Sequence, residues 1–251
     1  MEASILITVK NDKSNMIKLL NSLSNEVGKR AEVVIVDAYS NDGTYEILKN
    51  YEDKLDLKVD RIRGNRAVGR NRCIELASGE NYIFLDSDTE VPLGWFENFK
   101  RYFDRPIVAG KILQKGNVKW SDLGRVPMLF EGKDVTYPSN NLKYSKAVID
   151  EIGKFDERMH TAEDIDLNIR AVMKGYDIFY AEDVVVYHFP REDLMSLLKQ
   201  SYTDGIGRKY INRKYKLKSK FNINNLKAHP IIEFLRLSAG MVGYLLGDFH
   251  D

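Results

Sequence analysis

Two aspartates stand one residue apart at the end of an apolar run, and they are the residues of this chain best suited to chemistry. The run Tyr82–Leu85 leads directly into Asp86, Ser87 and Asp88. If the chain stays extended here, Asp86 and Asp88 lie on one side, because a strand directs alternate side chains to opposite faces. Two carboxylates that close repel each other unless a cation lies beside them.

The paired aspartates predict a site for a divalent cation. Mg²⁺ and Mn²⁺ prefer one or two carboxylates together with the phosphate oxygens of a substrate. The pair follows an apolar strand, and open α/β sheets bind ligands at the carboxyl ends of their strands. The alternative is a solvated acidic loop, since short motifs of this kind often occur without a metal.

Another carboxylate, Asp37, ends the apolar strand expected at Glu32–Val36. It could accept the imide N–H of a uracil or the amino N–H groups of a guanine. The backbone of Thr8, Val9 and Lys10 would flank the same base. The alternative is an aspartate that begins a turn and binds nearby backbone amides.

Two arginines, Arg66 and Arg70, lie one helical turn apart on a segment that leads into the sheet. A guanidinium group is suited to bidentate contact with phosphate, so one of them could meet the base or the diphosphate of a nucleotide. The alternative is a solvated helix face, which we favour for Arg66.

These residues need a scaffold of alternating strands and helices, and the hydrophobic pattern supplies one. Strands are expected at 4–9, 32–36, 55–59 and 81–85, and helices at 14–23, 44–51 and 67–77. Strands separated by helix-length segments imply βαβ units and a mainly parallel sheet of the α/β class. Beyond Pro106 we expect a strand at 107–113, largely irregular chain at 116–138, a helix at 162–174 and a buried strand at 184–187.

The composition fits a globular enzyme of 251 residues, with 43% hydrophobic and 30% charged residues. The formal net charge of +1 argues against a nucleic-acid partner. Cys73 is the only cysteine, so no disulfide can form within the chain. The first nine residues do not form a secretory signal, and no run of 18 or more uncharged apolar residues occurs, so we expect a cytoplasmic protein.

Several segments in a fixed order resemble family 2 glycosyltransferases of the GT-A fold. The matching segments are Val33–Asp37, Ser40–Thr44, Arg70–Asn71, Ala77–Glu80, Leu85–Asp88, Gly153–Glu157, Glu163–Arg170, Gly175–Tyr176 and Val184–His188. The resemblance covers roughly residues 4–190, and ordered motifs are far more specific than any one alone. It implies a GT-A, Rossmann-like domain over residues 1–190, with a basic, amphipathic helical extension over 191–251.

The resemblance implies a metal site that serves a nucleoside diphosphate sugar. Asp88 would be a direct ligand, Asp86 would contact the ribose or a metal-bound water, and His188 would be a further ligand, with Ser87 lining the nucleotide site. The cation, Mn²⁺ or Mg²⁺, would act as a Lewis acid that offsets charge on the departing phosphate. A lone histidine after a strand is more often structural, so only the ordered context favours ligation.

The resemblance also places a general base at Asp164, where it would take the proton of an acceptor hydroxyl. Asp166 and Asp156 are the alternatives. Glu163, which we expect near the donor, and Asp164 would open the helix at 163–174, where the helix dipole favours acidic residues and Thr161 could be the N-cap.

Asn140 and Asn141 could hydrogen-bond the donor sugar or line the acceptor entrance. The chain departs from the family where Ser139 replaces a frequent glycine. It also departs at 37–40, which lacks a second aspartate and a glycine, and at 7–11, which lacks a proline. These departures weaken any choice of nucleotide base.

The last sixty residues lie outside the strong part of the resemblance. Basic residues stand among aromatic and aliphatic ones here, at Arg208, Lys209, Arg213, Lys214, Lys216, Lys218 and Lys220. An apolar segment over 231–247 follows, with small residues every fourth position at Ala239, Gly243 and Gly247. The segment could bind an anionic membrane surface, form a homodimer through its helix, or dock on its own domain.

The sequence therefore predicts an inverting, metal-dependent glycosyltransferase. Its donor would be a nucleoside diphosphate sugar, a UDP-sugar ahead of a GDP-sugar, and its acceptor a glycan or a lipid-linked glycan. A sugar-phosphate nucleotidyltransferase is the first alternative, but it should show a glycine-rich loop after the first strand, and 10–14 has no glycine. A non-catalytic nucleotide-sugar-binding module is disfavoured because the metal and base positions are filled.

Overall fold

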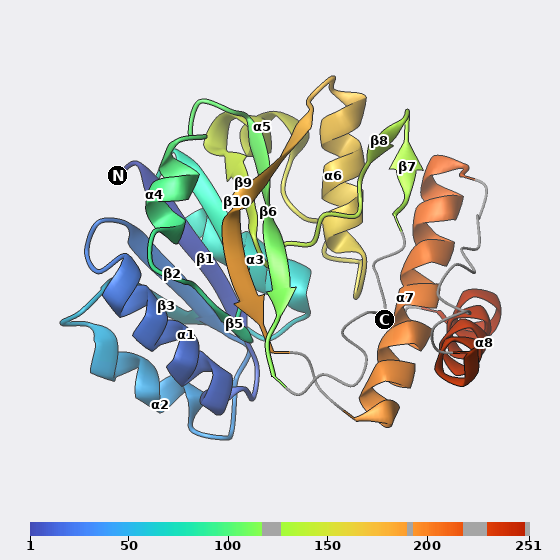
Figure 1. Cartoon of the computed structure of the whole chain (residues 1–251), viewed down its shortest axis with the longest axis horizontal. Coiled ribbons are helices and arrows are strands. Elements are labelled where there is room, and N and C mark those ends of the chain that lie inside the picture. The colour runs from blue at the N-terminus through green and yellow to red at the C-terminus, as the bar shows by residue number, and fades with distance from the viewer. Residues whose placement is uncertain (117–126, 190–192, 218–229, 249–251) are drawn as a thin grey trace.

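The computed structural model describes residues 1–116, 127–189, 193–217 and 230–248 (Figure 1). Its strands are β1 Ala3–Val9, β2 Glu32–Asp37, β3 Asp56–Arg61, β4 Asn81–Asp86, β5 Thr89–Glu90, β6 Ile107–Gln114, β7 Leu129–Phe130, β8 Lys133–Asp134, β9 Leu142–Ser145 and β10 Ile178–His188. Its helices are α1 Lys13–Glu26, α2 Thr44–Leu48, the 3₁₀ helix η1 Lys49–Tyr51, α3 Arg66–Leu76, α4 Trp95–Lys100, α5 Lys146–Ile152, α6 Glu163–Met173, α7 Leu194–Tyr215 and α8 Pro230–Leu246.

One sheet, in the order β3-β2-β1-β4-β9-β6-β10-β5, organises the fold. The first four strands in this order are parallel, with Val9 of β1 beside Asp37 of β2 and Thr8 beside Asp86 of β4. The carboxyl ends of β1, β2 and β4 therefore meet at one edge, which is where ligands bind in open α/β sheets.

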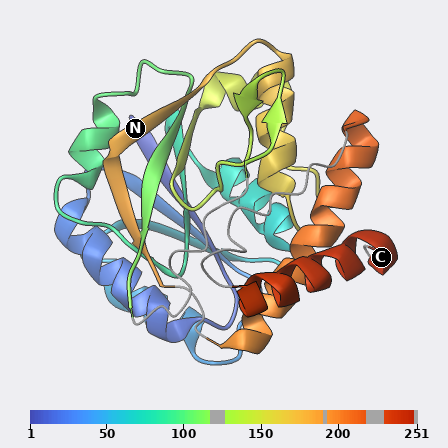
Figure 2. The same ribbon diagram turned by 45° about the vertical axis from the view of Figure 1, so that its right-hand side comes forward.

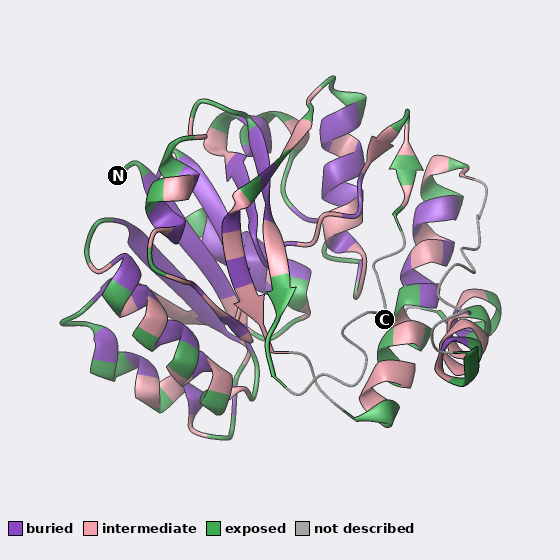
Figure 3. Cartoon of the chain, in the orientation of Figure 1, coloured by how far each residue is buried: buried purple, intermediate pink, exposed green. Residues whose placement is uncertain are grey.

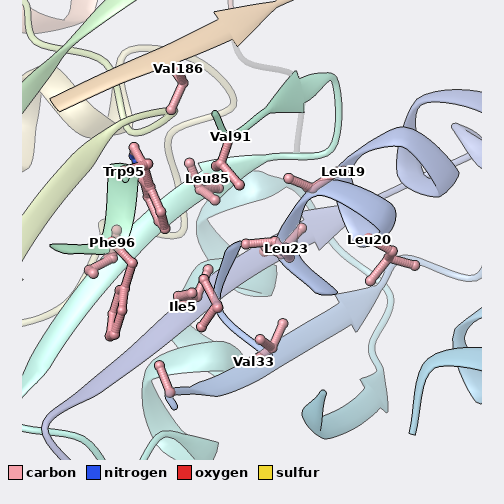
Figure 4. Packing of buried hydrophobic residues seen from close by; sticks show 14 of the residues in the cluster. Ile5, Leu19, Leu20, Leu23, Val33, Leu85, Val91, Trp95, Phe96 and Val186 are labelled. Atoms are coloured by element: carbon pink, nitrogen blue, oxygen red, sulfur yellow. The ribbon is translucent and has the colours of Figure 1, made fainter. Parts of the chain in front are cut away.

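The central strands β1, β2 and β4 are almost wholly buried because helices cover both faces of the sheet (Figure 3). On one face α1 and α4 pack their apolar sides, including Leu20, Leu23 and Trp95, against Ile5 and Val33 (Figure 4). On the other face α3, α5 and α6 cover the alternate strand residues. This alternation follows from the period of two in a strand.

The predicted elements of the first half are confirmed, with bounds that differ by one to three residues at most ends. The sheet is mixed rather than uniformly parallel, because β9 lies antiparallel between β4 and β6, and β5 is antiparallel to β10. The sequence pattern missed β9 because Lys143 interrupts its apolar run. Lys143 is nevertheless fully buried, with its ammonium group donating to the carbonyls of Phe103 and Arg105 in the turns that follow α4.

Three further differences concern connections. The stretch predicted as irregular at 116–138 contains the small hairpin β7–β8, and its residues 117–126 lie outside the described chain. The last strand, β10, begins at Ile178 rather than 184, because Glu182 and Asp183 sit at a bulge between two paired halves. The helices α4 and α5 were not predicted, since each is short.

The two C-terminal helices cross, as the turned view shows (Figure 2), and glycines lie at their contact. A Cβ atom on Gly205 of α7 would collide with the carbonyl of Gly240, and one on Gly243 of α8 would collide with that of Tyr202. The small residues of α8 therefore pack against α7 of the same chain, as in the alternative in which the last helix docks on its own domain. In the described ranges, no helix combines the length and the apolar character needed to cross a membrane.

Candidate active site

The carboxyl edge of β4 holds a buried guanidinium between two carboxylates. Arg70, 4% exposed on α3, donates from Nη2 to Asp86 Oδ1 at 2.9 Å and from Nη1 to Glu163 Oε1 at 2.5 Å. Burial disfavours the charged forms of Arg70 and Asp86, but the attraction between the guanidinium group and the carboxylates outweighs it. The pKa of Arg70 is therefore raised, and the pKa of Asp86 is lowered. Arg70 thus ties the strand end that bears Asp86 to the helix start that bears Glu163.

Asp88 and His188 lie together a short distance farther on. His188 Nε2 is 3.4 Å from Asp88 Oδ2, while His188 Nδ1 is 3.0 Å from Gln114 Oε1. The main chain also joins them, since the Phe189 N–H donates to the Asp88 carbonyl at 2.9 Å. Burial alone would lower the pKa of His188, but the hydrogen bond and charge of Asp88 outweigh it and raise the pKa.

The residues at this point fit a divalent cation. The other carboxylate oxygen of Asp88, Oδ1, is buried and has no hydrogen-bond partner among the described residues. An unpaired carboxylate oxygen beside an imidazole nitrogen is a suitable start for Mn²⁺ coordination. No group of three or more histidine, cysteine or acidic side chains in the described chain would hold a metal by itself. Phosphate oxygens of a bound diphosphate would have to complete the site.

Asp86 and Asp88 were expected on one side of an extended strand, and this prediction is wrong. The strand β4 ends at Asp86, and a turn begins at Ser87. Asp86 faces Arg70, and Asp88 faces His188. Ser87 donates its hydroxyl to Asp12 Oδ2 at 2.8 Å, a contact with the chain just before α1 that the sequence pattern did not single out. The two carboxylates therefore have separate partners.

Asp164 lies in the first turn of α6 in a site that favours its protonated form. The Ile165 N–H donates to Asp164 Oδ1 at 2.8 Å, and the Ser139 N–H is 3.4 Å from Oδ2. Burial, and then the neighbouring charge of Glu163, raise the pKa of Asp164 to about 6. A carboxylate with a pKa near the working pH is well matched to general-base catalysis.

The start of α6 is not capped as the sequence suggested. The N-cap is Ala162, with a left-handed φ of 60° and no side-chain cap, so the prediction of Thr161 as N-cap is wrong. The left-handed region is unfavourable for alanine, and such strain persists only where the surroundings impose it. Gly207 of α7 packs closely against this turn, since a Cβ at that position would approach the side chains of Ala162 and Thr161 to 2.8 and 3.0 Å.

The alternative bases are both held by cations. Asp166 is fully buried and accepts from Tyr215 at 2.7 Å, Lys214 at 2.6 Å and Arg170 at 2.9 Å. Asp156 is held by Arg158 and Lys214, which keep its pKa far below the usual value. Neither is as well placed as Asp164 to take a proton.

The asparagine pair divides into two roles. Asn141 uses its whole side chain in the framework: Nδ2 donates to the carbonyls of Lys111 and Val184, and Oδ1 accepts from Trp95 Nε1. Both ends of its amide are engaged in the framework, rather than with the donor sugar or the acceptor entrance that the sequence suggested for Asn141. Asn140 Oδ1 and Ser139 Oγ are buried without partners in the described structure, and Asn140 stays a candidate for the donor.

Asp37 has the geometry of a turn residue. Its two oxygens accept from the Ser40 N–H at 3.2 and 3.0 Å, and Arg61 Nε lies 3.0 Å from Oδ2. Sequence analysis missed Arg61, which also lies 4.6 Å from the ring centre of Tyr39. Tyr39, left-handed and 46% exposed, occupies the segment where the chain departs from the family pattern, and this departure was the signal to inspect.

The remaining predicted residues surround the same edge. The Val9 carbonyl accepts from the Ala38 N–H at 2.8 Å, which fixes the neighbouring strand ends. Thr8 is partly buried, and its methyl group limits how closely α3 can approach, since a Cβ at Gly69 would lie 2.9 Å from it. Lys10 and Arg66 are exposed. Asp37, Thr8, Val9, Asp86, Asp88, His188 and Asp164 thus belong to the end of the sheet that holds the site.

Comparison with known sequences finds glycosyltransferases. Residues 4–154 match the family described as Glycosyl transferase family 2, and residues 126–246 match Glycosyl transferase family group 2. The glycosyltransferase AglE of Haloferax volcanii is 28% identical over 222 residues, which is 81% of this chain and 72% of that protein. The poly(ribitol-phosphate) beta-N-acetylglucosaminyltransferase TarS of Staphylococcus aureus is 23% identical over 77% of this chain but only 36% of its own length.

Comparison with solved structures supports the fold. The structure of S. aureus TarS 1-349 in complex with UDP-GlcNAc has a TM-score of 0.65 at 21% identity, with 97% of this chain and 82% of that chain covered. A mannosyltransferase from Pyrobaculum calidifontis in complex with GDP-Man and Mn²⁺ has a TM-score of 0.67 at 17% identity, with 96% and 73% covered. The predicted GT-A fold is confirmed.

Proposed function

The chain belongs to glycosyl transferase family 2, and from this membership we propose that it transfers a sugar, with inversion, from a nucleoside diphosphate sugar to a glycan or lipid-linked acceptor. One observation supports this most: an unpaired Asp88 oxygen beside His188, and Asp164 with its raised pKa, belong to the same end of one sheet. Asp88 and His188 suit a diphosphate and its cation, and Asp164 suits an acceptor hydroxyl that must lose a proton.

The chain's own residues divide the reaction between them. Asp164 takes the proton of the acceptor hydroxyl as that oxygen attacks the anomeric carbon, on the face opposite the departing diphosphate. Attack from that face inverts the configuration. Asp88 and His188 would hold a divalent cation, which when bound supplies positive charge for the leaving phosphate. Arg70 keeps Asp86 ionised and fixes Glu163 beside the base.

We favour a UDP-sugar, with Asp37, Tyr39 and Arg61 near the base, and keep a GDP-sugar as the second choice. Two solved structures of the same fold were determined with UDP-GlcNAc and with GDP-Man. A nucleotidyltransferase is disfavoured because the turn between β1 and α1 has no glycine for a phosphate loop.

A panel of nucleotide sugars tests the proposal directly. With Mn²⁺ present, one donor should be hydrolysed slowly by the full chain even without an acceptor, and chelation should stop the hydrolysis because the leaving phosphate loses its positive partner. Release of the nucleoside diphosphate, followed by chromatography, measures this. If no donor is bound or hydrolysed, with or without Mn²⁺, the proposed function is wrong.

We also propose that α8 holds the enzyme on an anionic membrane surface. The helix exposes an apolar stripe made of Ile231, Phe234, Met241, Val242, Leu245 and Leu246. The preceding chain is basic, although Lys218 and Lys220 lie outside the described residues. An apolar stripe with basic residues close by suits the interface of an anionic bilayer. The small residues of α8 pack on α7, so the stripe is left as the outward face.

Flotation with vesicles that contain phosphatidylglycerol tests the membrane proposal. Phe234→Ser combined with Leu245→Ser should lower vesicle binding by about tenfold, because two apolar side chains lose their burial. Leu93→Ser, at an equally exposed leucine near α4, is the matched control and should bind as the parent does. Failure of the parent protein to float with the vesicles would reject the membrane surface as its partner.

A further inference from the structure

Two neighbouring side chains beside the proposed base are buried and keep a polar atom unpaired. Ser139 is 1% exposed and Asn140 is 7% exposed, yet Ser139 Oγ and Asn140 Oδ1 have no hydrogen-bond partner in the described part of the chain. Buried polar atoms are nearly always paired, because an unpaired one loses its hydrogen bonds to water and gains none in return. Two such atoms on successive residues therefore point to a bound molecule.

The turn that carries Ser139 and Asn140 is held at both ends by other residues. Before the turn, Asn168 of α6 donates from Nδ2 to two carbonyls of residues 135–137, at 3.0 and 2.8 Å. After the turn, the side chain of Asn141 binds three groups of the framework. The turn is thus fixed without the side chains of Ser139 and Asn140, and a site on a fixed turn is ready for its ligand.

The turn lies between the proposed base and the strand that bears the aspartates. On one side, the Ser139 N–H is 3.4 Å from Asp164 Oδ2. On the other side, β9 begins at Leu142 and is antiparallel to β4, so the residues just before Leu142 lie toward the strand end that bears Asp86. The turn therefore adjoins both halves of the candidate active site.

This position fits the part of the donor sugar next to its anomeric carbon. An acceptor hydroxyl that gives its proton to Asp164 lies about 2.6–3.2 Å from the carboxylate. The anomeric carbon that the hydroxyl attacks lies about 3–3.5 Å farther on. The substituent at C2 is attached to the neighbouring carbon of the ring. Ser139, in contact with Asp164, and Asn140 beside it are thus close to the place of that substituent.

An acetamido group has the polar atoms that would pair with these two residues. Asn140 Oδ1 can only accept a hydrogen bond, whereas the Ser139 hydroxyl can donate one. The two atoms do not bond each other, so a group between them must offer both a donor and an acceptor. An acetamido group offers its N–H and its C=O at separate atoms. The single oxygen of a sugar hydroxyl would have to serve both residues.

We propose that the donor is a UDP-sugar with an acetamido group at C2, and that Ser139 and Asn140 recognise this group. The acetamido N–H donates to Asn140 Oδ1, and the Ser139 hydroxyl donates to the acetamido oxygen. The inference rests on the proposed function, since it names the sugar of that donor. Ser139 and Asn140 are then specificity residues, separate from the metal site and the base.

Calorimetry in the presence of Mn²⁺, with UDP, UDP-glucose and UDP-N-acetylglucosamine as ligands, tests the inference. The full chain should bind UDP-N-acetylglucosamine at least about tenfold more tightly than UDP-glucose, because two buried polar atoms gain partners. Asn140→Ala and Ser139→Ala should each reduce this ratio about three- to tenfold, while the Kd of UDP stays the same. Asn25→Ala, at an exposed asparagine of α1, is the matched control.

The melting temperature separates recognition from a structural role. Ser139→Ala removes a buried oxygen that makes no hydrogen bond in the described structure, so the Tm of the ligand-free protein should stay the same or rise. A structural role for Ser139 predicts the opposite result, which is a lower Tm with an unchanged ratio of the two Kd values.

The Kd of UDP distinguishes failure of this inference from failure of the proposed function. If UDP binds but the two sugars bind equally, or if the ratio survives both alanine variants, the acetamido site is wrong and the proposed function stands. If UDP itself does not bind, the UDP-sugar donor of the proposed function is contradicted, and this inference is contradicted with it.

Discussion

Asp164→Asn should lower kcat for sugar transfer by about 10²–10⁴-fold, because asparagine keeps the shape of the side chain but cannot take a proton. Donor affinity should change little, since the nucleotide is expected at β1, β2 and the Asp88 site rather than at α6. Transfer rate and donor Kd, measured on the same preparation, separate the two effects. Asp150→Asn, at an exposed aspartate paired with Lys146, is the matched control.

The pH profile provides an independent check on the same residue. A base must be ionised to act, and the pKa of Asp164 is raised to about 6 by burial and by Glu163. Transfer by the parent should therefore fall as pH drops through about 6, and the residual activity of Asp164→Asn should lack that fall. Near-normal transfer by Asp164→Asn would instead move the role of base to Asp166 or Asp156, in spite of the cations that hold both.

Asp88→Ala should remove the dependence of UDP binding on Mn²⁺. Loss of residues that merely support a metal ligand often costs 10–100-fold in metal affinity, so loss of a ligand itself should cost at least about 100-fold. Calorimetry of UDP with and without Mn²⁺ measures the difference. Glu90→Ala, two residues away in a pair with Lys115, controls for the loss of a nearby carboxylate. A mutant that keeps the full metal response would show that Asp88 is not a ligand.

The first half of the fold was predictable because its signals are local. The apolar runs at β1, β2 and β4 alternate with amphipathic helices, and each run ends at or near a residue of the site. The start of α6 was placed correctly at Glu163, although the sequence could not show that Ala162 would adopt a left-handed conformation. The ends of strands and the starts of helices can thus be predicted from hydrophobic periods of two and of 3.6 residues.

The partners of charged residues were not predictable, because they join distant elements. Arg70 and Glu163 are 93 residues apart, and nothing in either segment names the other. Either Arg66 or Arg70 was predicted to meet the base or the diphosphate of the nucleotide, and the structure shows Arg70 between two carboxylates. Asn141 was predicted to bind the donor sugar or to line the acceptor entrance, and it binds Trp95 and two carbonyls of the neighbouring strands. The sequence pattern identifies a polar residue at the end of a strand, but the packing of the folded chain decides what that residue contacts.

The contact of α7 with the turn before α6 limits how these two segments can change independently in evolution. Gly207 packs against Ala162, and Tyr215 and Lys214 bind Asp166. The segment after residue 193 thus helps to hold the start of α6, which carries Asp164. Natural variation or a recombination library that exchanged the tail for a foreign one would have to exchange this turn with it. The tail and the proposed base would then be inherited as one block rather than changed one at a time.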